Sequence, residues 1–192
     1  MLFSFLEDFF GYVEENNIDL YNEFSLQHEL GIYLRDNLDD YKVQFERNVS
    51  FFKDKKNDFE DMDFIKKEID ISIFDNDFSE CYAIELKYPR NGQYPEEMYS
   101  FIKDIKFMEQ LKEAGFKETY CITLVDNSSK PFFMGNKDDG IYQYFRNNEV
   151  ITGKVYKPTG KSKGIDFINI NGKYSINWID DGDSRKKYLL TI

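Results

Sequence analysis

Two acidic residues and a lysine stand at alternating positions in two neighbouring apolar segments. Glu85 and Lys87 share one face of segment 81–88, because successive side chains of a strand point to opposite faces. Asp70 is separated in the same way from the isoleucines that alternate along segment 68–74. These residue types at these spacings indicate two carboxylates with an ammonium group beside them.

The polar stretch 75–80 between the two segments predicts a β-hairpin. With the turn centred on Asp77 and Phe78, the numbers of opposed residues sum to 155, so Asp70 lies opposite Glu85. Opposed side chains have Cβ atoms about 4.5–5.5 Å apart, and two carboxylates at that separation repel unless a cation lies between them. Carboxylate oxygens of this kind favour Mg²⁺, with Mn²⁺ as a substitute.

Lys87 and Leu86 extend this pair. Lys87 lies two residues beyond Glu85, about 7 Å along the strand, so its side chain can reach a water held by the metal. An ammonium group at that point would orient the water and offset the charge that develops on a phosphate. The carbonyl of Leu86 is a further candidate metal ligand. The expected chemistry is phosphodiester hydrolysis by a metal-activated water.

Apolar periodicity predicts the elements that must hold these side chains. Segments 3–15 and 20–38 have helical spacing, and a third helix opens at Pro95 and continues until Gly115 ends it. A helix between a hairpin and a further strand forms a crossover, so we predict an α/β fold, a mixed β-sheet flanked by helices. The expected strands lie at 41–52, 68–74, 81–88, 117–125, 165–170, 173–179 and 186–192, and the expected loops at 53–63 and 127–140.

The C-terminal third is expected to be a small β-rich extension. A chain of 192 residues can form one full core, so we predict a single domain over 1–192 with an extension over 126–192. Within the extension, Asn171-Gly172 and Asp181-Gly182 are dipeptides typical of hairpin turns. The short strands are therefore expected to be joined at these two points.

The order of the charged residues resembles a known superfamily. Asp70, then fourteen residues, then Glu85-Leu86-Lys87 on a hairpin between helices is similar to the PD-(D/E)XK nucleases. The resemblance covers about residues 20–125 and implies a restriction-endonuclease-like core. In that superfamily the aspartate and glutamate bind magnesium and the lysine assists the attacking water. Ile69 stands where the motif name has a proline.

The resemblance also implies a fourth catalytic residue. In these nucleases an acidic residue from an earlier helix often completes the site, and the matching position is Glu29 in Gln27-His-Glu-Leu30. The leading interpretation is therefore a magnesium-dependent nuclease with Asp70, Glu85, Lys87 and Glu29 in its active site. The expected partner is DNA. An RNA substrate stays open, as does a homodimer, because the residues show no unambiguous interface stripe.

The net charge of −11 complicates contact with nucleic-acid phosphates. The charge is uneven, since residues 151–192 carry eight Lys and Arg against four Asp, or +4, and residues 1–150 carry 17 against 32, or −15. Lysines that could contact a nucleic-acid backbone lie on the third helix and in the basic C-terminal part: Lys103, Lys106, Lys161 and Lys163. It is an equally good interpretation that these four lysines are ordinary solvated charges on the surface.

The acidity of residues 1–150 supports a second interpretation. A catalytically silent binding protein on the same fold could neutralise a basic toxin or mimic nucleic acid. Magnesium binding that depends on Asp70 and Glu85 would separate the two classes, because a silent scaffold has no need of it.

Two further features concern the surroundings of the protein. No stretch approaches the roughly 20 apolar residues that cross a bilayer, and the first ten residues lack a basic leader, so we expect a cytoplasmic protein without a membrane partner. Cys81 and Cys121 each lie inside an apolar segment, which predicts buried reduced thiols rather than a disulfide or a zinc site.

Overall fold

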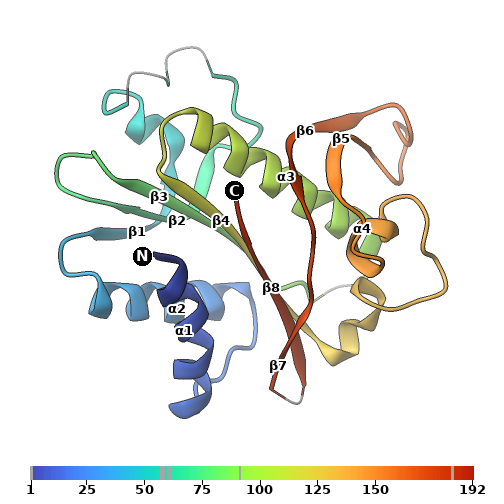
Figure 1. Cartoon of the computed structure of the whole chain (residues 1–192), viewed down its shortest axis with the longest axis horizontal. Coiled ribbons are helices and arrows are strands. Elements are labelled where there is room, and N and C mark those ends of the chain that lie inside the picture. Colours follow the sequence, from blue (N-terminus) through green and yellow to red (C-terminus); the bar gives the residue numbers. More distant parts are fainter. Residues whose placement is uncertain (1, 57–58, 60–61, 91, 183) are drawn as a thin grey trace.

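The computed structural model describes residues 2–56, 59, 62–90, 92–182 and 184–192. Four α-helices and eight strands make up most of this part of the chain (Figure 1). The helices are α1 (Leu2–Glu15), α2 (Glu23–Asn37), α3 (Tyr94–Glu113) and α4 (Tyr142–Arg146), with 3₁₀ helices η1 (Val49–Phe52) and η3 (Asn127–Phe132). The strands are β1 (Lys42–Asn48), β2 (Glu68–Phe74), β3 (Cys81–Lys87), β4 (Glu118–Asp126), β5 (Ile151–Tyr156), β6 (Phe167–Tyr174), β7 (Ile179–Asp181) and β8 (Arg185–Thr191).

A mixed six-stranded sheet forms the centre of the molecule, in the order β1-β2-β3-β4-β8-β7. The β3 and β4 strands pair in parallel, with α3 as their connection, and the other neighbours pair antiparallel. Helices α1 and α2 cover one face and α3 covers the other (Figure 1). The predicted α/β class, with a mixed sheet between helices, is confirmed. None of the helices in the described part of the chain is long and apolar enough to cross a membrane.

Local sequence explains where the two site-bearing helices begin. Asn22 caps α2 with a reciprocal pair of bonds: its Oδ1 accepts from the Ser25 amide at 2.7 Å, and the Ser25 hydroxyl accepts from the Asn22 amide at 3.0 Å. Helix α3 has Pro95 in its first turn, where a missing amide hydrogen costs nothing. Gly115 follows α3 with φ of 91°, which only glycine adopts freely.

The β2–β3 hairpin has the predicted register. Its pairs run from Ile71↔Ile84 to Phe74↔Cys81, and each pair of numbers sums to 155. Within the turn, Phe78 has φ of 58° and its ring stacks on Phe74 at 4.9 Å between centroids. The alternation of apolar and polar residues therefore placed the hairpin correctly.

The predicted turn at Asn171-Gly172 is wrong, whereas the turn at Asp181-Gly182 is confirmed between β7 and β8. Strand β6 continues through Asn171 and pairs with β5, a strand absent from the sequence-based assignment; the register shifts between Ile151 and Gly153. The dipeptide lies at this irregularity because the backbone amides of Asn171 and Gly172 donate to the Glu109 carboxylate on α3.

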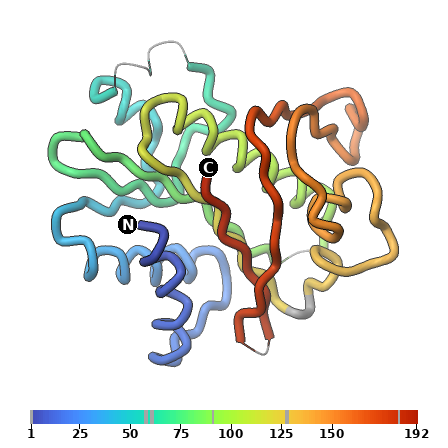
Figure 2. The backbone as a smooth tube through the Cα atoms, in the orientation of Figure 1, coloured from blue at the N-terminus to red at the C-terminus, as the bar shows by residue number. Residues whose placement is uncertain are grey.

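Residues 126–192 occupy two separate places. The β5–β6 hairpin and α4 pack on α3, whereas β7 and β8 extend the central sheet. Strand β8 pairs with β4 from Tyr120↔Thr191 to Asp126↔Arg185. Figure 2 shows the C-terminal strand running beside β4. The C-terminal part is thus an integral part of the sheet that holds the site.

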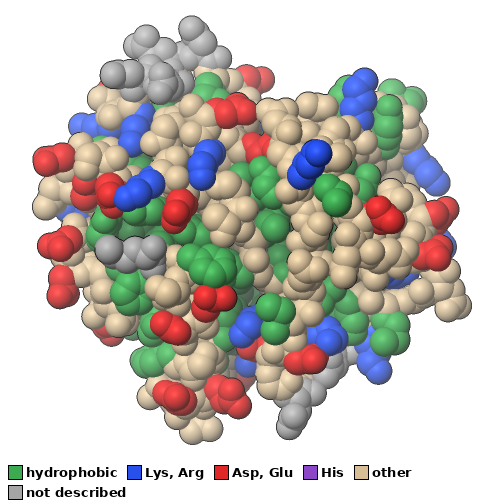
Figure 3. All heavy atoms as spheres, in the orientation of Figure 1, with side chains coloured by type: hydrophobic (Ala, Val, Ile, Leu, Met, Phe, Trp, Pro, Cys, Tyr) green, Lys and Arg blue, Asp and Glu red, His purple; other side chains and the backbone are tan. Residues whose placement is uncertain are grey.

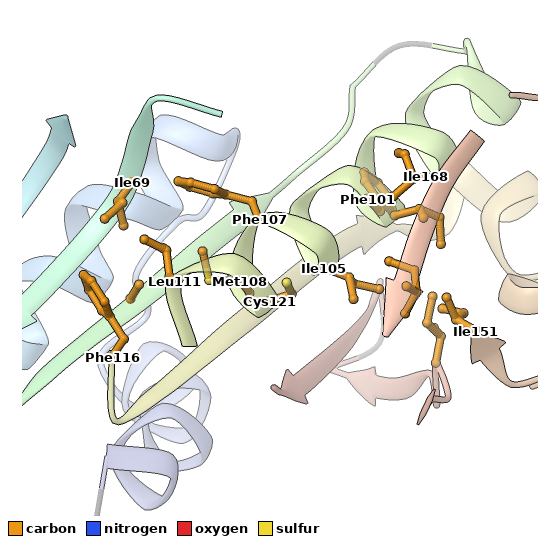
Figure 4. Close-up of a cluster of buried hydrophobic side chains, with 14 of the residues drawn as sticks. Ile69, Phe101, Ile105, Phe107, Met108, Leu111, Phe116, Cys121, Ile151 and Ile168 are labelled. Atoms are coloured by element: carbon orange, nitrogen blue, oxygen red, sulfur yellow. The ribbon is translucent and has the colours of Figure 1, made fainter. Parts of the chain in front are cut away.

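Helix α3 carries the larger of two hydrophobic cores. In Figure 4, Met108 and Leu111 on α3 lie near Ile69 of β2, and Phe101 lies toward Ile168 of β6. The same core includes both cysteines, which are buried free thiols as predicted. The helix therefore joins the central sheet on one side to the β5–β6 hairpin on the other.

Candidate active site

Asp70 and Glu85 stand opposite each other where β2 and β3 separate. The last backbone pair between the two strands is Ile71↔Ile84. Beyond it, the Asp70 and Glu85 carboxylates accept from backbone amides of the opposite strand. The Leu86 amide donates to Asp70 Oδ2 at 2.7 Å, and the Asp70 amide lies 3.4 Å from Glu85 Oε1. The Glu85 carboxylate therefore faces the Asp70 amide, and the Asp70 carboxylate accepts from the residue next to Glu85. The two predicted residues lie together.

A third carboxylate and a second lysine join this pair. Lys66, just before β2, donates from Nζ to Glu85 Oε2 and to Asp104 Oδ1 on α3, the latter at 2.8 Å. Lys87 Nζ lies 3.4 Å from Asp104 Oδ2. The cation between two of the carboxylates is thus an ammonium group of the chain itself.

Sequence reasoning missed Lys66 and Asp104, although the position of Asp104 in the sequence could have indicated a buried charge. Asp104 lies three residues after Phe101 and four before Met108, so it falls within the apolar stripe of α3. A charged residue in a buried stripe indicates a partner inside the protein. Lys66 left no such signal, since it belongs to an irregular segment.

Helix α2 contributes Glu23 and Gln27. Glu23 Oε1 lies 3.8 Å from Lys87 Nζ, and its Oε2 accepts from the Tyr88 amide at 3.0 Å. Gln27 Nε2 donates to the Asp70 carbonyl at 2.8 Å. One helical turn separates Glu23 from Gln27, so both side chains lie on the same face of α2.

Glu29 lies on a different face of α2 from the one that contacts β2 and β3. It follows Gln27 by two residues, which is about 200° around a helix. The Glu29 carboxylate is 3.5 Å from the Nδ1 atom of His28, an exposed neighbour. Within the described residues it makes no contact with Asp70 or Glu85. The acidic residue that α2 brings to the site is Glu23.

Burial determines the electrostatics of the cluster. Glu85 is 1% exposed and Asp104 is 3% exposed. Burial raises the pKa of Asp70 to about 6, and it raises the pKa of Glu85 well above its ordinary value, with Asp70 as the next cause. For Lys66 and Lys87, burial acts to lower the pKa, but Asp104 and the other acids outweigh it and the pKa is raised. Both lysines are therefore charged at neutral pH.

The other predicted site residues lie in three places. The Leu86 carbonyl accepts from Lys87 Nζ at 2.8 Å, at the site. On α3, Lys103 is half-buried, and Lys106, two residues after Asp104, forms an ion pair with Glu109 at 3.1 Å between Nζ and Oε2. Lys161 and Lys163 are exposed in the loop between β5 and β6.

The cluster can be tested for its fit to a divalent metal ion. Within the described residues, no group of three or more His, Cys, Asp or Glu side chains is arranged to hold a metal, since Lys66 lies between Glu85 and Asp104. Three carboxylates, those of Asp70, Glu85 and Asp104, lie beside two ammonium groups, and burial raises the pKa of Asp70 and that of Glu85. Asp104 Oδ2 is buried without a hydrogen bond from any described residue. Carboxylate oxygens are the ligands that Mg²⁺ prefers, so the donor set has the right chemistry for the ion, and Lys66 occupies the position between Glu85 and Asp104 in this structure.

Comparisons with known proteins do not assign the chain to a family. No protein-family model matches it, and neither the curated proteins nor the solved structures returned a significant match. The fold and the site by themselves define the class: a mixed α/β protein with a buried cluster of carboxylates and lysines at the point where a hairpin opens between two helices.

Proposed function

We propose that this protein is a magnesium-dependent nuclease that hydrolyses phosphodiester bonds of DNA, through a PD-(D/E)XK-type site on a restriction-endonuclease-like core. The observation that carries the proposal is the juxtaposition of Asp70 and Glu85, each bonded to backbone beside the other, with the Lys87 side chain next to them. The order of helix α2, hairpin, α3 and parallel β4 supports it, since these elements surround the pair.

The residues divide the work by their chemistry. Asp70 and Glu85, with the carbonyl of Leu86, would hold magnesium, which when bound supplies an activated water and polarises the phosphate. Lys87 carries a fixed positive charge that would offset the charge developing on the phosphate. Glu23 and Asp104 keep this ammonium group in place from both sides, at 3.8 and 3.4 Å.

The test is plasmid nicking with Mg²⁺ or Mn²⁺. Asp70→Asn and Glu85→Gln keep the shape of the side chains and remove their charge, so each is expected to slow nicking by at least about a hundredfold. Glu29→Gln is the matched control, because it makes the same chemical change on α2 outside the cluster and should keep the wild-type rate. An Asp70→Asn protein that still cuts DNA would end the assignment.

A second function is favoured by the position of Lys66. Its ammonium group already pairs with Glu85 and Asp104, as a silent acidic binding protein would require if it kept this arrangement without a metal. Calorimetric titration with Mg²⁺ discriminates the two functions. The nuclease binds Mg²⁺, and Glu85→Gln weakens that binding; a silent protein shows no Mg²⁺ binding that depends on Glu85.

A further inference from the structure

A cleft of about 560 Å³ lies outside the carboxylate cluster, between α4 and the β5–β6 hairpin. Its walls carry Lys137, Lys154, Lys157 and Lys163 against a single aspartate, Asp139. We call it the lysine–tyrosine cleft, because Tyr142, Tyr144 and Tyr156 line it as well. In a chain with a net charge of −11, this is a local concentration of positive charge. Figure 3 shows lysine or arginine side chains over the region of this hairpin.

The lysines of the cleft are not neutralised by the protein. Among the described residues, none of the four forms an ion pair, in contrast to Lys66 and Lys87 in the cluster. Lys154 and Lys163 are exposed and Lys157 is half-buried. Four unpaired ammonium groups around one hollow suit a ligand with several negative charges.

Aromatic rings stand beside these lysines. Tyr156 is 49% exposed and meets the edge of Phe167, itself 43% exposed, at 5.7 Å between ring centroids. Lys154 Nζ lies 4.3 Å from the centroid of Phe167. Large rings left open to solvent next to unpaired lysines match the way proteins bind single strands, with phosphates on the lysines and unpaired bases on the rings. Bases stacked within a duplex cannot reach such rings.

The cleft reaches the first turn of α3, the helix that carries Asp104. Pro95, in the first turn of α3, lines the cleft, and Thr159 in the β5–β6 loop donates to the Glu96 carboxylate. Asp104 lies nine positions after Pro95, which is about 14 Å along the axis of α3 and about 180° around it, so the two residues face opposite sides of the helix.

We infer that the lysine–tyrosine cleft binds a single-stranded segment of nucleic acid. The inference rests on the proposed function for the fate of the strand, and it adds the substrate class.

The experiment is fluorescence anisotropy with a labelled oligothymidylate in EDTA, so that binding is measured without cleavage. Replacing Lys154, Lys157 and Lys163 together with glutamine should weaken binding about tenfold or more and lower the slope of log K against log salt by about 2, because single-strand binding loses about 0.7 per phosphate contact. The matched control replaces three exposed lysines outside the cleft, Lys42, Lys53 and Lys173, with glutamine and should bind as the wild type does.

A ring variant tests the stacking part separately. Tyr156→Ala should weaken oligothymidylate binding several-fold, whereas Tyr156→Phe should keep it, because the ring and not the hydroxyl stacks on a base. Cleft and control triple variants with equal affinity overturn the inference. So does thymidine monophosphate that competes as well as the oligonucleotide, since that marks a mononucleotide site, and so does a duplex that binds more tightly than the single strand.

The inference and the proposed function can fail independently. If the protein binds the oligonucleotide through the cleft but cuts no DNA, the binding role of the cleft stands and the proposed nuclease function is wrong. If the wild type and the cleft triple variant cut DNA equally fast and bind the oligonucleotide equally well, the nuclease function stands and the binding role of the cleft is wrong.

Discussion

Burial of Asp70 couples the protonation of the site to stability. The pKa of Asp70 rises from 3.8 to about 6 on folding, mainly because the carboxylate is removed from water, and Glu85 shifts in the same direction. Between pH 3.8 and about 6, the folded protein therefore binds more protons than the unfolded chain does. The stability contributed by protonated Asp70 is therefore fully present below about pH 4 and is lost as the pH rises through about 6.

Asp70→Asn should flatten this dependence, because asparagine stays neutral at every pH. Between about pH 4.5 and 7.5, in EDTA, the wild type should lose on the order of 2 kcal/mol more free energy of unfolding than Asp70→Asn does. Urea titrations at the two pH values measure it, with Glu29→Gln as a control whose pH profile parallels that of the wild type. Parallel profiles for Asp70→Asn and the wild type would contradict the burial argument.

At the scale of elements, Glu109 is the main polar link between α3 and β6. It is 5% exposed, and its oxygens accept from the Asn171 amide at 2.9 Å and the Gly172 amide at 2.6 Å. The hydroxyl of Tyr174 donates to the same carboxylate at 3.2 Å. Charged acceptors make the stronger hydrogen bonds in proteins, so this side chain adds a polar link to the apolar packing that places the β5–β6 hairpin, and with it the lysine–tyrosine cleft, on the helix.

Glu109→Ala should loosen the hairpin on α3, since it leaves the backbone amides of Asn171 and Gly172 without their acceptor. We expect a loss on the order of 3 kcal/mol in the free energy of unfolding. Hydrogen exchange should speed up in β5 and β6 but not in the β2–β3 hairpin. Glu113→Ala is the control, because Glu113 lies one turn further along α3. Its carboxylate accepts from the Asn171 side-chain amide at 2.9 Å, and this bond is exposed. Its expected cost is within about 0.5 kcal/mol, and equal costs for the two variants would refute this role of Glu109.

For the whole molecule, the last strand completes the sheet that holds the site. Strand β8 lies between β4 and β7, and seven residue pairs join it to β4. Without β8, the buried strand β4 would present unpaired backbone groups along one edge. The rings of Tyr188 on β8 and Trp178 also meet edge to face at 5.0 Å, so core contacts would be lost as well.

A chain without residues 185–192 is therefore expected to lose cooperative unfolding and to aggregate. Circular dichroism during heating, together with sedimentation, measures both effects. A chain that lacks only Ile192 loses one backbone bond, to the Thr119 carbonyl at 2.9 Å, and should still unfold cooperatively. Cooperative unfolding of the shorter chain would contradict this role of β8.

Sequence alone determined the parts of this protein that depend on local alternation. The β2–β3 register, and with it the opposition of Asp70 and Glu85, followed from a period of two and a short polar turn, because neither depends on distant residues. The same reasoning failed at Asn171-Gly172. There the amides are bound by Glu109, 62 residues earlier in the chain, which no local turn preference can reveal.

Tertiary structure alone decided which charges surround the carboxylate pair. Lys66 reaches Glu85 across 19 positions and Asp104 across 38, and Glu23 rather than Glu29 faces Lys87 because of how α2 is rotated on the sheet. The insertion of β8 beside β4 was decided in the same way. The physical reason is that helix rotation and strand order are selected by the burial of whole apolar faces, to which a single charged residue contributes little.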